Sequence, residues 1–302
     1  MLNVTRLQVL HTVARLGSLT AAAAELSYTT SAVSQQISSL ERETGTRLLD
    51  RHPRGVRLTE AGRVLAEHAG RVLAELRAAE TAVAAVTRGI AGRLRFSSFR
   101  TANAVLMPRA VAAFRASHPE VSLELAELDP DPALAGLADH DLDLALGYEF
   151  PLVPLPPTGD VETVPLLTDP LHIALASDHP LARRKRLSLA ELAGQPWIQG
   201  VHHGSTTEVL PLACRAAGFT PDVLFRTDDQ VTVRGLVAAG VGIALASSLT
   251  LATLPPDVVA RPVNEPSLRR TVFAMRPAPQ HRLPAADAML DALRTASAEA
   301  PP

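Results

Sequence analysis

The feature that most constrains this chain is a short helical pattern at residues 29–44 whose two faces differ sharply. Val33, Ile37 and Leu40 recur at spacings of four and three, which places them on one face of an α-helix. Thr29 is a natural N-cap and Gly45 a natural stop. The opposite face carries short hydroxyls and amides with no charge before Glu41. Such a helix packs on one side and offers hydrogen-bonding groups on the other.

Two shorter helical patterns come before it. In the first, Leu7, Leu10 and Val13 recur at helical spacing and Gly17 ends the pattern. The second follows a Ser18 cap, and the Ser27-Tyr28 turn leads into the third. Two helices joined by a tight turn, the second with a polar uncharged face, are typical of a helix-turn-helix. An ordinary three-helix bundle with a polar surface fits this local pattern as well.

Two strand-like segments follow, Leu48–Arg51 and Val56–Leu58, around the turn sequence His52-Pro53-Arg54-Gly55. We interpret them as a wing whose arginines reach backbone phosphates or the minor groove, although each arginine alone could be an ordinary solvated charge. Ser, Thr and Gln can hydrogen-bond base edges in the major groove. The residues that we predict to contact DNA are Thr29, Thr30, Ser31, Ser34, Gln35, Gln36, Arg51, Arg54 and Arg57.

Charge is distributed unevenly along the chain. Residues 1–58 contain seven arginines and four acidic residues, whereas the whole chain of 302 residues has a net charge of −2. A basic first domain on an acidic body is expected where one end of a protein meets phosphate. The length predicts about two domains, and the balance of 47% hydrophobic and 20% charged residues is that of a globular protein.

The composition also argues against several kinds of binding site and several classes of protein. Cys214 is the only cysteine, which excludes an intrachain disulfide and a four-thiolate zinc site. The N-terminal stretch does not resemble a secretory signal. The longest uncharged stretch, Gly235–Pro256, contains Gly240 and Gly242, and we interpret it as a helix, a turn and a strand rather than a membrane span. We therefore expect a cytoplasmic protein without membrane contact.

Several fixed spacings over about fifty residues resemble the signature of LysR-type transcriptional regulators. They lie at residues 17–22, 32–37, 40–41, 45, 48–51 and 58–62, and weaker similarity continues at 117–119, 142–145, 178–182 and 236–243. The resemblance implies an α/β protein with a winged helix-turn-helix at 1–58, a linker helix at 59–90 and an effector domain at 91–302. That domain would have two α/β lobes similar to periplasmic binding proteins, lobe I at about 91–160 and 267–302 and lobe II at about 161–266. Leu49 replaces the family's usual Phe, and Thr29-Thr30 replace its commoner Ser-Gln.

The linker block has its own periodicity. From a Thr59 cap, apolar residues step by four or three: Ala61, Leu65, Ala69, Val72, Leu76, Ala79, Val83 and Val86. A seam with a 3.5-residue period suggests a pair of helices between subunits. A single amphipathic helix packed on its own domain is the alternative. Periodicity supports a homodimer, and the family resemblance implies a homotetramer.

The effector region alternates strands and helices, and ligands of such sheets bind at the carboxyl ends of strands, where helix N-termini attract anions. We expect a strand at Arg93–Ser98 and a helix that opens near Ala102–Asn103. Two chain crossings, near Pro151–Val161 and Val263–Leu268, would join the lobes as a hinge. The candidate effector contacts are Ser97, Ser98, Phe99, Arg100, Thr101, Gln199, His202, His203, Ser205, Thr206, Thr227 and Asp228.

The hydroxyls, the guanidinium group and a helix N-terminus favour a small anionic or strongly polar effector of unknown identity. We predict no cofactor and no metal, because the side chains of adjacent histidines point apart and no third ligand stands at a suitable spacing. An enzyme is disfavoured by the absence of G-x-S-x-G, G-x-G-x-x-G, P-loop and H-E-x-x-H motifs. A solute-binding protein for transport would lack the helix-turn-helix. The expected partners are double-stranded promoter DNA, further copies of the chain, the effector and RNA polymerase.

Overall fold

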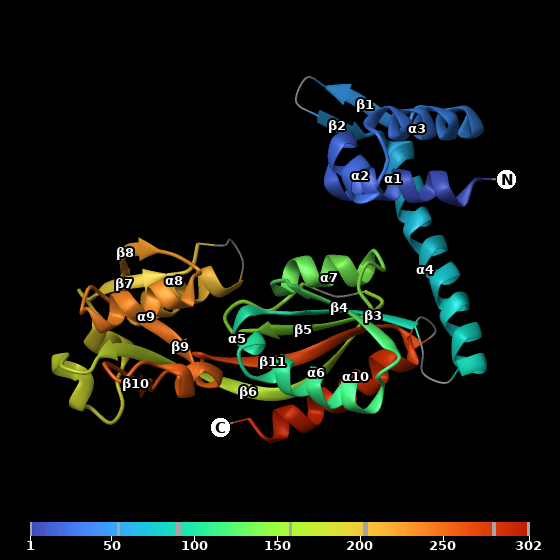
Figure 1. Ribbon diagram of the computed structural model, residues 1–302. Coiled ribbons are helices and arrows are strands. Elements are labelled where there is room, and N and C mark those ends of the chain that lie inside the picture. Colours follow the sequence, from blue (N-terminus) through green and yellow to red (C-terminus); the bar gives the residue numbers. More distant parts are fainter. Residues whose placement is uncertain are drawn as a thin grey trace. The chain divides into compact units, whose positions relative to one another are not determined.

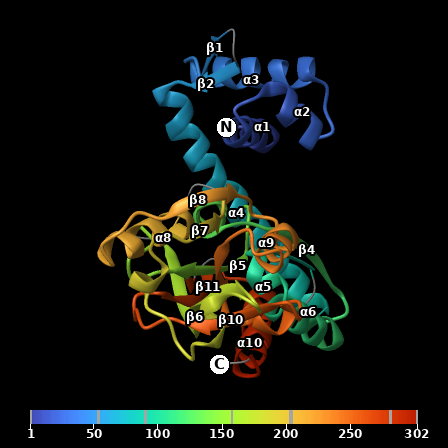
Figure 2. The same cartoon turned by 90° about the vertical axis from the view of Figure 1, so that its left-hand side faces the viewer.

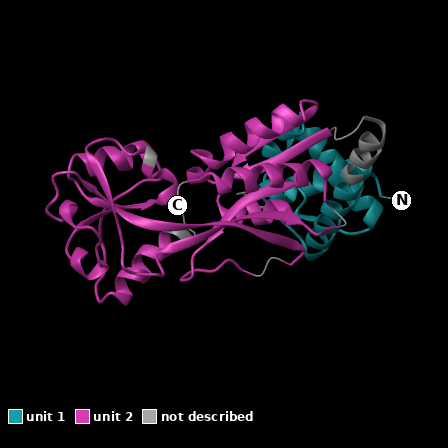
Figure 3. Cartoon of the chain, turned by 90° about the horizontal axis from the view of Figure 1, so that it is seen from below, with its two compact units in different colours: residues 1–89, 139–141 teal, residues 90–138, 142–302 magenta. Residues whose placement is uncertain are grey.

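The computed structural model divides the chain into two compact units (Figure 3). The first comprises residues 1–89 with 139–141, and the second comprises residues 90–138 with 142–302. The residues that the structure describes are 2–52, 55–88, 92–156, 159–201, 205–279 and 282–300.

The first unit contains helices and one β-hairpin (Figure 1). Its elements are α1 (Val4–Leu16), α2 (Leu19–Glu25), α3 (Thr30–Thr44), β1 (Leu49–His52), β2 (Gly55–Leu58) and α4 (Glu60–Arg88). The Ser18 side chain accepts a hydrogen bond from the Ala21 amide, and the Thr29 side chain accepts one from Ala32. Gly17 and Gly45 end α1 and α3 at φ values of 63° and 70°, a left-handed conformation that favours glycine. These caps confirm the helix boundaries that the sequence predicts.

The apolar stripe of α3 forms the core of this unit. Val33, Ile37 and Leu40 are buried against Leu7 and Leu10 of α1. Glu41, the first charge on α3, accepts hydrogen bonds from the backbone amides of Leu48 at 2.9 Å and Leu49 at 3.3 Å. These bonds tie α3 to the antiparallel hairpin, which lies beside it (Figures 1 and 2).

The apolar seam of α4 is divided between two environments. The Thr59 hydroxyl caps the helix by accepting from the Gly62 amide at 3.0 Å. Ala69 is buried and Leu65 is half-buried in the core that α1 and α3 form. Val72 and Leu76, farther along, are 43% and 42% exposed. The first part of the seam therefore packs on its own unit, which corrects the prediction of one continuous intersubunit seam, and only the later part is available to another chain.

We expect Val72→Lys with Leu76→Lys to weaken self-association of the chain on the order of 100-fold or more. Each apolar side chain buried in an interface contributes about 1.5–3 kcal/mol, and each charge placed there would have to be desolvated. Light scattering coupled to size-exclusion chromatography measures the assembly. Glu67→Lys is the control, because Glu67 lies on α4 outside the seam with a side chain that is 74% exposed. An unchanged mass for the double variant would contradict this interface.

The second unit is built on one mixed sheet, which contains nine strands within the described residues. Eight of them follow the order β4-β3-β5-β11-β6-β9-β7-β8, and β10 pairs with β6. The strands are β3 (Gly92–Ser98), β4 (Val121–Glu127), β5 (Leu144–Glu149), β6 (Val161–Ala176), β7 (Pro196–Gln199), β8 (Asp222–Arg226), β9 (Ile243–Ser247), β10 (Val258–Pro262) and β11 (Arg269–Pro277).

Helices cover both faces of this sheet. They are α5 (Arg100–Asn103), α6 (Leu106–Ser117), α7 (Pro130–Ala138), α8 (Ser205–Ala216), α9 (Gln230–Ala238) and α10 (Pro284–Ala298), with short 3₁₀ turns η1 (Pro180–Arg183), η2 (Leu189–Leu192) and η3 (Ser248–Thr253). In β5, Leu144 and Leu146 face the core that includes α6 and α10, whereas Ala145 faces α7. Figure 1 shows α7 on one side of the sheet and α6 with α10 on the other. The single helix expected to open near Ala102–Asn103 is instead two helices, α5 and α6.

The long strand β6 joins the two lobes. Its residues 161–170 pair with β11, and its residues 171–176 pair with β9 and β10. The first crossing therefore lies inside β6 near Pro170–Leu171, which corrects the expected position at 151–161. The second crossing lies between Pro262, where β10 ends, and Arg269, where β11 begins, as predicted. The Leu171 amide donates to the Leu268 carbonyl at 2.9 Å, so the two crossings are hydrogen-bonded to each other.

Within the described part of the chain, every helix is too short or too polar to cross a lipid bilayer.

Candidate effector cavity and DNA-binding surface

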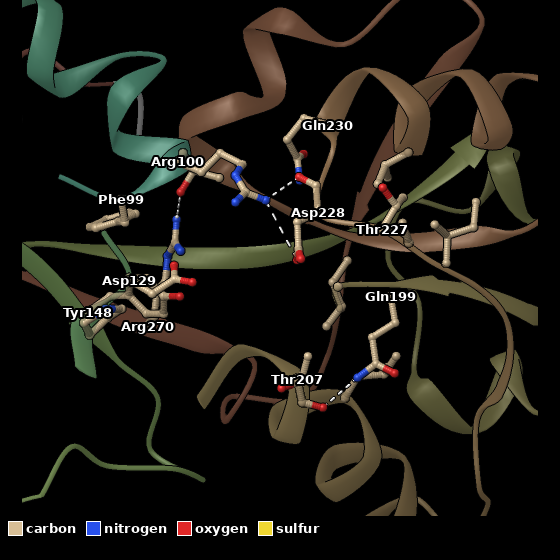
Figure 4. A pocket seen from close by; sticks show the side chains of 18 of the residues that line it. Phe99, Arg100, Asp129, Tyr148, Gln199, Thr207, Thr227, Asp228, Gln230 and Arg270 are labelled. Carbon is tan, nitrogen blue, oxygen red and sulfur yellow. Dashed lines mark hydrogen bonds and ion pairs between the residues drawn. The ribbon is translucent and has the colours of Figure 1, made fainter. Parts of the chain in front are cut away.

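A cavity of about 240 Å³ opens in the second unit where the two lobes meet (Figure 4). Lobe I contributes Phe99 after β3, α5, the start of α7, β5 and β11, and lobe II contributes the end of β7, the starts of α8 and α9, and β9. The lining residues are Phe99, Arg100, Thr101, Asp129, Pro130, Asp131, Pro132, Tyr148, Ile198, Gln199, Gly200, Thr207, Leu210, Thr227, Asp228, Gln230, Val233, Ala244, Leu245 and Arg270.

Half of the predicted effector contacts line this cavity: Phe99, Arg100, Thr101, Gln199, Thr227 and Asp228. Ser97 and Ser98 do not, because they lie inside β3 between two paired strands and are 0% and 1% exposed. His202 and His203 fall outside the described residues. Ser205 and Thr206 begin α8, but their side chains are also outside the described part. Gln199 is the last residue of β7.

Arg100 bridges the two lobes across this cavity. Its Nε donates to the Glu127 carboxylate at 3.2 Å on β4, and Nη1 donates to the backbone carbonyl of Asp228. The same Nη1 lies 3.8 Å from the Asp228 carboxylate, and Figure 4 shows Arg100 directed at that residue. Because Asp228 belongs to the loop before α9, any change in the lobe arrangement must alter these contacts.

Arg270 is a second bridging residue, which we did not predict from the sequence. Its side chain is 5% exposed and pairs with Asp169, whose side chain is 0% exposed, at 2.7 Å. Nη2 also donates to the Thr101 hydroxyl at 2.6 Å and to the Ser247 hydroxyl at 3.1 Å. The alternation of side chains along a strand could have revealed Arg270 as a buried residue. Arg270 shares a face of β11 with the buried residues Val272 and Ala274.

Two aromatic rings cover the Arg270 guanidinium group. Its central carbon lies 5.0 Å from the Phe99 ring centroid and 4.6 Å from that of Tyr148, within cation–π range. The rings themselves meet edge to face at 4.7 Å. Because the Thr101 hydroxyl accepts a hydrogen bond from Arg270, Thr101 belongs both to the bridge and to the cavity wall.

The wall from lobe II is held by backbone and side-chain hydrogen bonds. Gln199 donates to the Thr207 carbonyl at 2.6 Å and accepts from Arg226 at 2.9 Å. The Asp228 carboxylate accepts from the Val201 amide at 3.1 Å. A Cβ on Gly200 would lie 2.7 Å from an Asp228 carboxylate oxygen, so a larger residue here would displace the Asp228 side chain.

The first unit places part of the predicted DNA surface in solvent. Thr29, Thr30, Ser31 and Gln35 are exposed on α3, and Arg57 is exposed on β2. The Thr29 hydroxyl is also the helix cap. Ser34 and Gln36 are half-buried, and the Gln36 amide oxygen accepts from Arg6 at 3.3 Å. The Arg51 side chain and Arg54 lie outside the described residues. Thr30, Ser31 and Gln35 are therefore the predicted base-reading side chains that are exposed on α3, and the Ser31 hydroxyl also lies 2.9 Å from that of Thr29.

Comparisons with known proteins agree with this architecture. Residues 4–63 match the family model described as "Bacterial regulatory helix-turn-helix protein, lysR family", and residues 87–298 match "LysR substrate binding domain". A probable HTH-type transcriptional regulator, LrrA of Synechococcus elongatus, is 31% identical over 300 residues, 99% of this chain and 98% of the relative. The chain thus has the fold of a two-domain DNA-binding regulator. It belongs to the LysR family of transcriptional regulators.

Two solved structures share the fold at low identity. A cysteine-to-aspartate variant of full-length OxyR from Pseudomonas aeruginosa aligns with a TM-score of 0.72 at 20% identity and covers 97% of this chain and 95% of its own. Full-length CbnR in complex with its target DNA aligns with a TM-score of 0.62 at 22% identity, covering 98% of this chain and 100% of its own.

Cys214, the single cysteine, lies in surroundings that disfavour reaction of its thiol. It is fully buried in α8, and burial together with the nearby Glu265 charge raises the pKa of its thiol to about 12. Thiol-based sensing needs an accessible thiolate. Groups of three or more His, Cys, Asp or Glu that could hold a metal ion do not occur among the described residues.

We expect Cys214 to resist thiol reagents in the folded protein. With a pKa of about 12, only about one thiol in 10⁴ is ionised at pH 8, and burial blocks access to that fraction. Titration with a chromogenic disulfide reagent should release no colour from the native chain and one equivalent after unfolding in guanidinium chloride. One equivalent released rapidly from native protein would show that Cys214 is exposed.

Proposed function

We propose that this regulator reads promoter DNA with α3 and the β1–β2 wing and changes its output when a small molecule occupies the interlobe cavity. The observation that carries the effector half of this proposal is the cavity itself, because residues from both lobes line it and Arg100 and Arg270 bridge the lobes there. A ligand can shift such a protein only if it binds one lobe arrangement better than another. A typical coupling is about 1–3 kcal/mol.

We further propose that the protein acts as a homo-oligomer in the cytoplasm, without catalysis of its own. Two separate apolar surfaces support self-association. One is the exposed part of the α4 seam, and the other includes Leu224 and Phe225 of the edge strand β8, which are 57% and 45% exposed. A symmetric dimer presents two recognition helices to a palindromic site, and a second surface allows two dimers to join as a tetramer. RNA polymerase is the proposed downstream partner.

The test is a thermal-shift screen of the full chain against a library of small metabolites, with two matched tryptophan variants. Gln230 lines the cavity at the first turn of α9, whereas its neighbour Val231 is 75% exposed and lies outside the lining. We expect at least one compound to raise the melting temperature of the wild type and of Val231→Trp but not of Gln230→Trp. The same compound should alter binding to DNA from the chain's own upstream region in gel-shift assays.

Equal shifts in the wild type and Gln230→Trp would place the binding site elsewhere. A gel shift that does not distinguish the upstream DNA from unrelated DNA of equal length would contradict sequence-specific recognition.

A further inference from the structure

A run of four basic residues lies in lobe II, on the turn that follows β6. Residues 183–186, with the sequence Arg-Arg-Lys-Arg, are all exposed, whereas Ala182 before them and Leu187 after them are 4% and 0% exposed. Residues 90–302 as a whole contain 18 arginines and lysines and 23 acidic residues. The run is therefore a local positive surface on a negatively charged part of the chain.

Hydrogen bonds fix the backbone at both ends of this run. Before it, the His179 side chain accepts from the Leu181 amide at 3.1 Å, where η1 begins. After it, the Leu187 amide donates to the Pro262 carbonyl at 3.0 Å, and the Asn264 amide donates to the Leu187 carbonyl at 2.9 Å. The four basic side chains are thus confined to one short, structured stretch of surface.

Two guanidinium groups at this turn are positioned by uncharged acceptors. Arg186 donates from Nε to the Asn264 side-chain oxygen at 3.1 Å and from Nη2 to the Val263 carbonyl at 3.0 Å. Arg261 on β10 donates from Nε to the Ala182 carbonyl at 2.8 Å and from Nη1 to the carbonyl of the preceding residue at 2.9 Å. These bonds hold both groups in place without neutralising them, which distinguishes this surface from an ordinary run of solvated charge.

Carboxylates cover little of this positive charge. Glu191 lies 3.6 Å from the Nη2 atom of Arg184, and the two side chains are 36% and 64% exposed. An exposed pair at that distance is weak. Within the described part of the chain, Arg183 and Lys185 make no ion pair. The turn therefore presents cationic groups to solvent for which this lobe supplies few partners.

We propose that this surface, the basic turn (Arg183–Arg186 with Arg261), binds phosphates of the DNA duplex whose bases α3 reads. Four of its five cationic groups are guanidinium groups, whose planar fork suits two phosphate oxygens at once. A duplex carries closely spaced charges, so it can reach several of these groups together, and a duplex already held by α3 is present at a high effective concentration. The contact adds affinity without reading sequence. This inference goes beyond the proposed function, because it does not depend on the effector cavity.

The first test removes three charges with Arg183→Gln, Arg184→Gln and Lys185→Gln, and keeps Arg186 and Arg261, whose side chains hydrogen-bond the backbone. The full-length variant is titrated with a duplex from its own upstream region at several salt concentrations. Each phosphate contact contributes about 0.9 to the slope of the logarithm of the binding constant against the logarithm of the salt concentration. The slope should therefore become shallower by about 2–3 units for each chain that contacts the duplex. Binding to unrelated DNA should weaken by the same factor.

The control is Arg115→Gln with Arg215→Gln and Arg294→Gln, which removes the same charge from exposed positions on α6, α8 and α10. General electrostatic attraction depends on the total charge of the protein, so this variant measures the part of the effect that is not local. Its slope should stay close to that of the wild type. An equal change of slope in the two triple variants would overturn the proposal.

The second test follows Lys185 by itself, because it is the only lysine of the chain. A water-soluble acetylating reagent modifies Lys185 and the N-terminal amine, and mass spectrometry of the peptide that contains Lys185 gives the rate at this site. With the duplex at about ten times its Kd, acetylation should slow on the order of tenfold, because the free fraction of the protein falls by that factor. Poly-L-glutamate, an acidic polypeptide without phosphates, should protect Lys185 less.

Unchanged acetylation of Lys185, while gel shifts show that the duplex is bound, would overturn the proposal and leave recognition by α3 intact. Greater protection by poly-L-glutamate than by DNA would assign the basic turn to an acidic protein instead. Protection by DNA together with a wild-type salt slope in the Arg183→Gln/Arg184→Gln/Lys185→Gln variant would show that another copy of the chain, rather than phosphate, covers Lys185, and would overturn the proposal as well.

Discussion

Replacing Asp169 with Asn should destabilise the second unit by about 3–5 kcal/mol. The exchange leaves the Arg270 guanidinium group buried without a compensating charge, and breaking a buried ion pair on one side typically costs this much. At roughly 2–4 °C per kcal/mol for a domain of this size, the melting temperature of the unit should fall by about 6–20 °C. Calorimetry on the full chain resolves this transition. Arg270→Met should have an effect of similar size.

Combining the two exchanges should recover more than half of the loss, because neither buried charge then remains unpaired. The control is Arg294→Ala, which breaks the pair between Arg294 and Asp291 on α10, whose side chains are 54% and 74% exposed. Exposed pairs contribute about 0–1 kcal/mol, so this variant should melt close to the wild type. Additive losses in the double variant would show that Asp169 and Arg270 do not stabilise each other. The bridge also contacts Thr101 in lobe I and Ser247 in lobe II, so its loss should change the response to an effector.

Replacing Ser31 and Gln35 with Ala should abolish sequence-specific DNA binding while leaving the first unit folded. Both side chains are exposed on α3, away from the buried stripe of Val33, Ile37 and Leu40. Each lost base contact costs about 1–3 kcal/mol, or on the order of ten- to hundredfold in Kd. Footprinting on the upstream DNA, alongside circular dichroism, measures binding and folding separately. Protection of the same site at wild-type concentrations would contradict the assignment.

The wing provides a contrast within the same experiment. Arg57 on β2 is exposed, and Arg57→Ala should weaken binding to specific and unrelated DNA alike. The slope of the logarithm of the binding constant against the logarithm of the salt concentration should become shallower by about one unit. An unchanged salt slope would place Arg57 away from the phosphates.

The local architecture of the first unit could be predicted because its determinants lie close together in sequence. The Thr29 cap acts on an amide three residues away, Gly45 ends the helix that it follows, and the stripe from Val33 to Leu40 repeats within two turns. The same local reasoning was incomplete for α4. Its period is continuous, but only contact with α1 and α3 decides that Leu65 is covered by its own unit while Leu76 is exposed.

For the effector site, the sequence predicted less and the tertiary structure decided more. The rule that ligands bind at carboxyl ends of strands led to Arg100, Thr101 and Asp228, which do line the cavity. It also led to Ser97 and Ser98, because a sequence does not show that β3 lies between two other strands and is covered there. The preference for an anionic or strongly polar effector stays a prediction. Arg100 was visible in the sequence, but its partners on other elements were not.

By itself the sequence determined where the helices of the first unit begin and end and the family to which the chain belongs. These depend on periodicity, caps and fixed spacings within a few turns of chain. The tertiary structure alone decided which described residues line the cavity and which of them bridge its lobes. Arg270 meets Thr101 from 169 positions away, and Arg100 meets Asp228 from 128. Such pairs depend on the order of strands in the sheet, which brings distant residues together without leaving a repeat in the sequence.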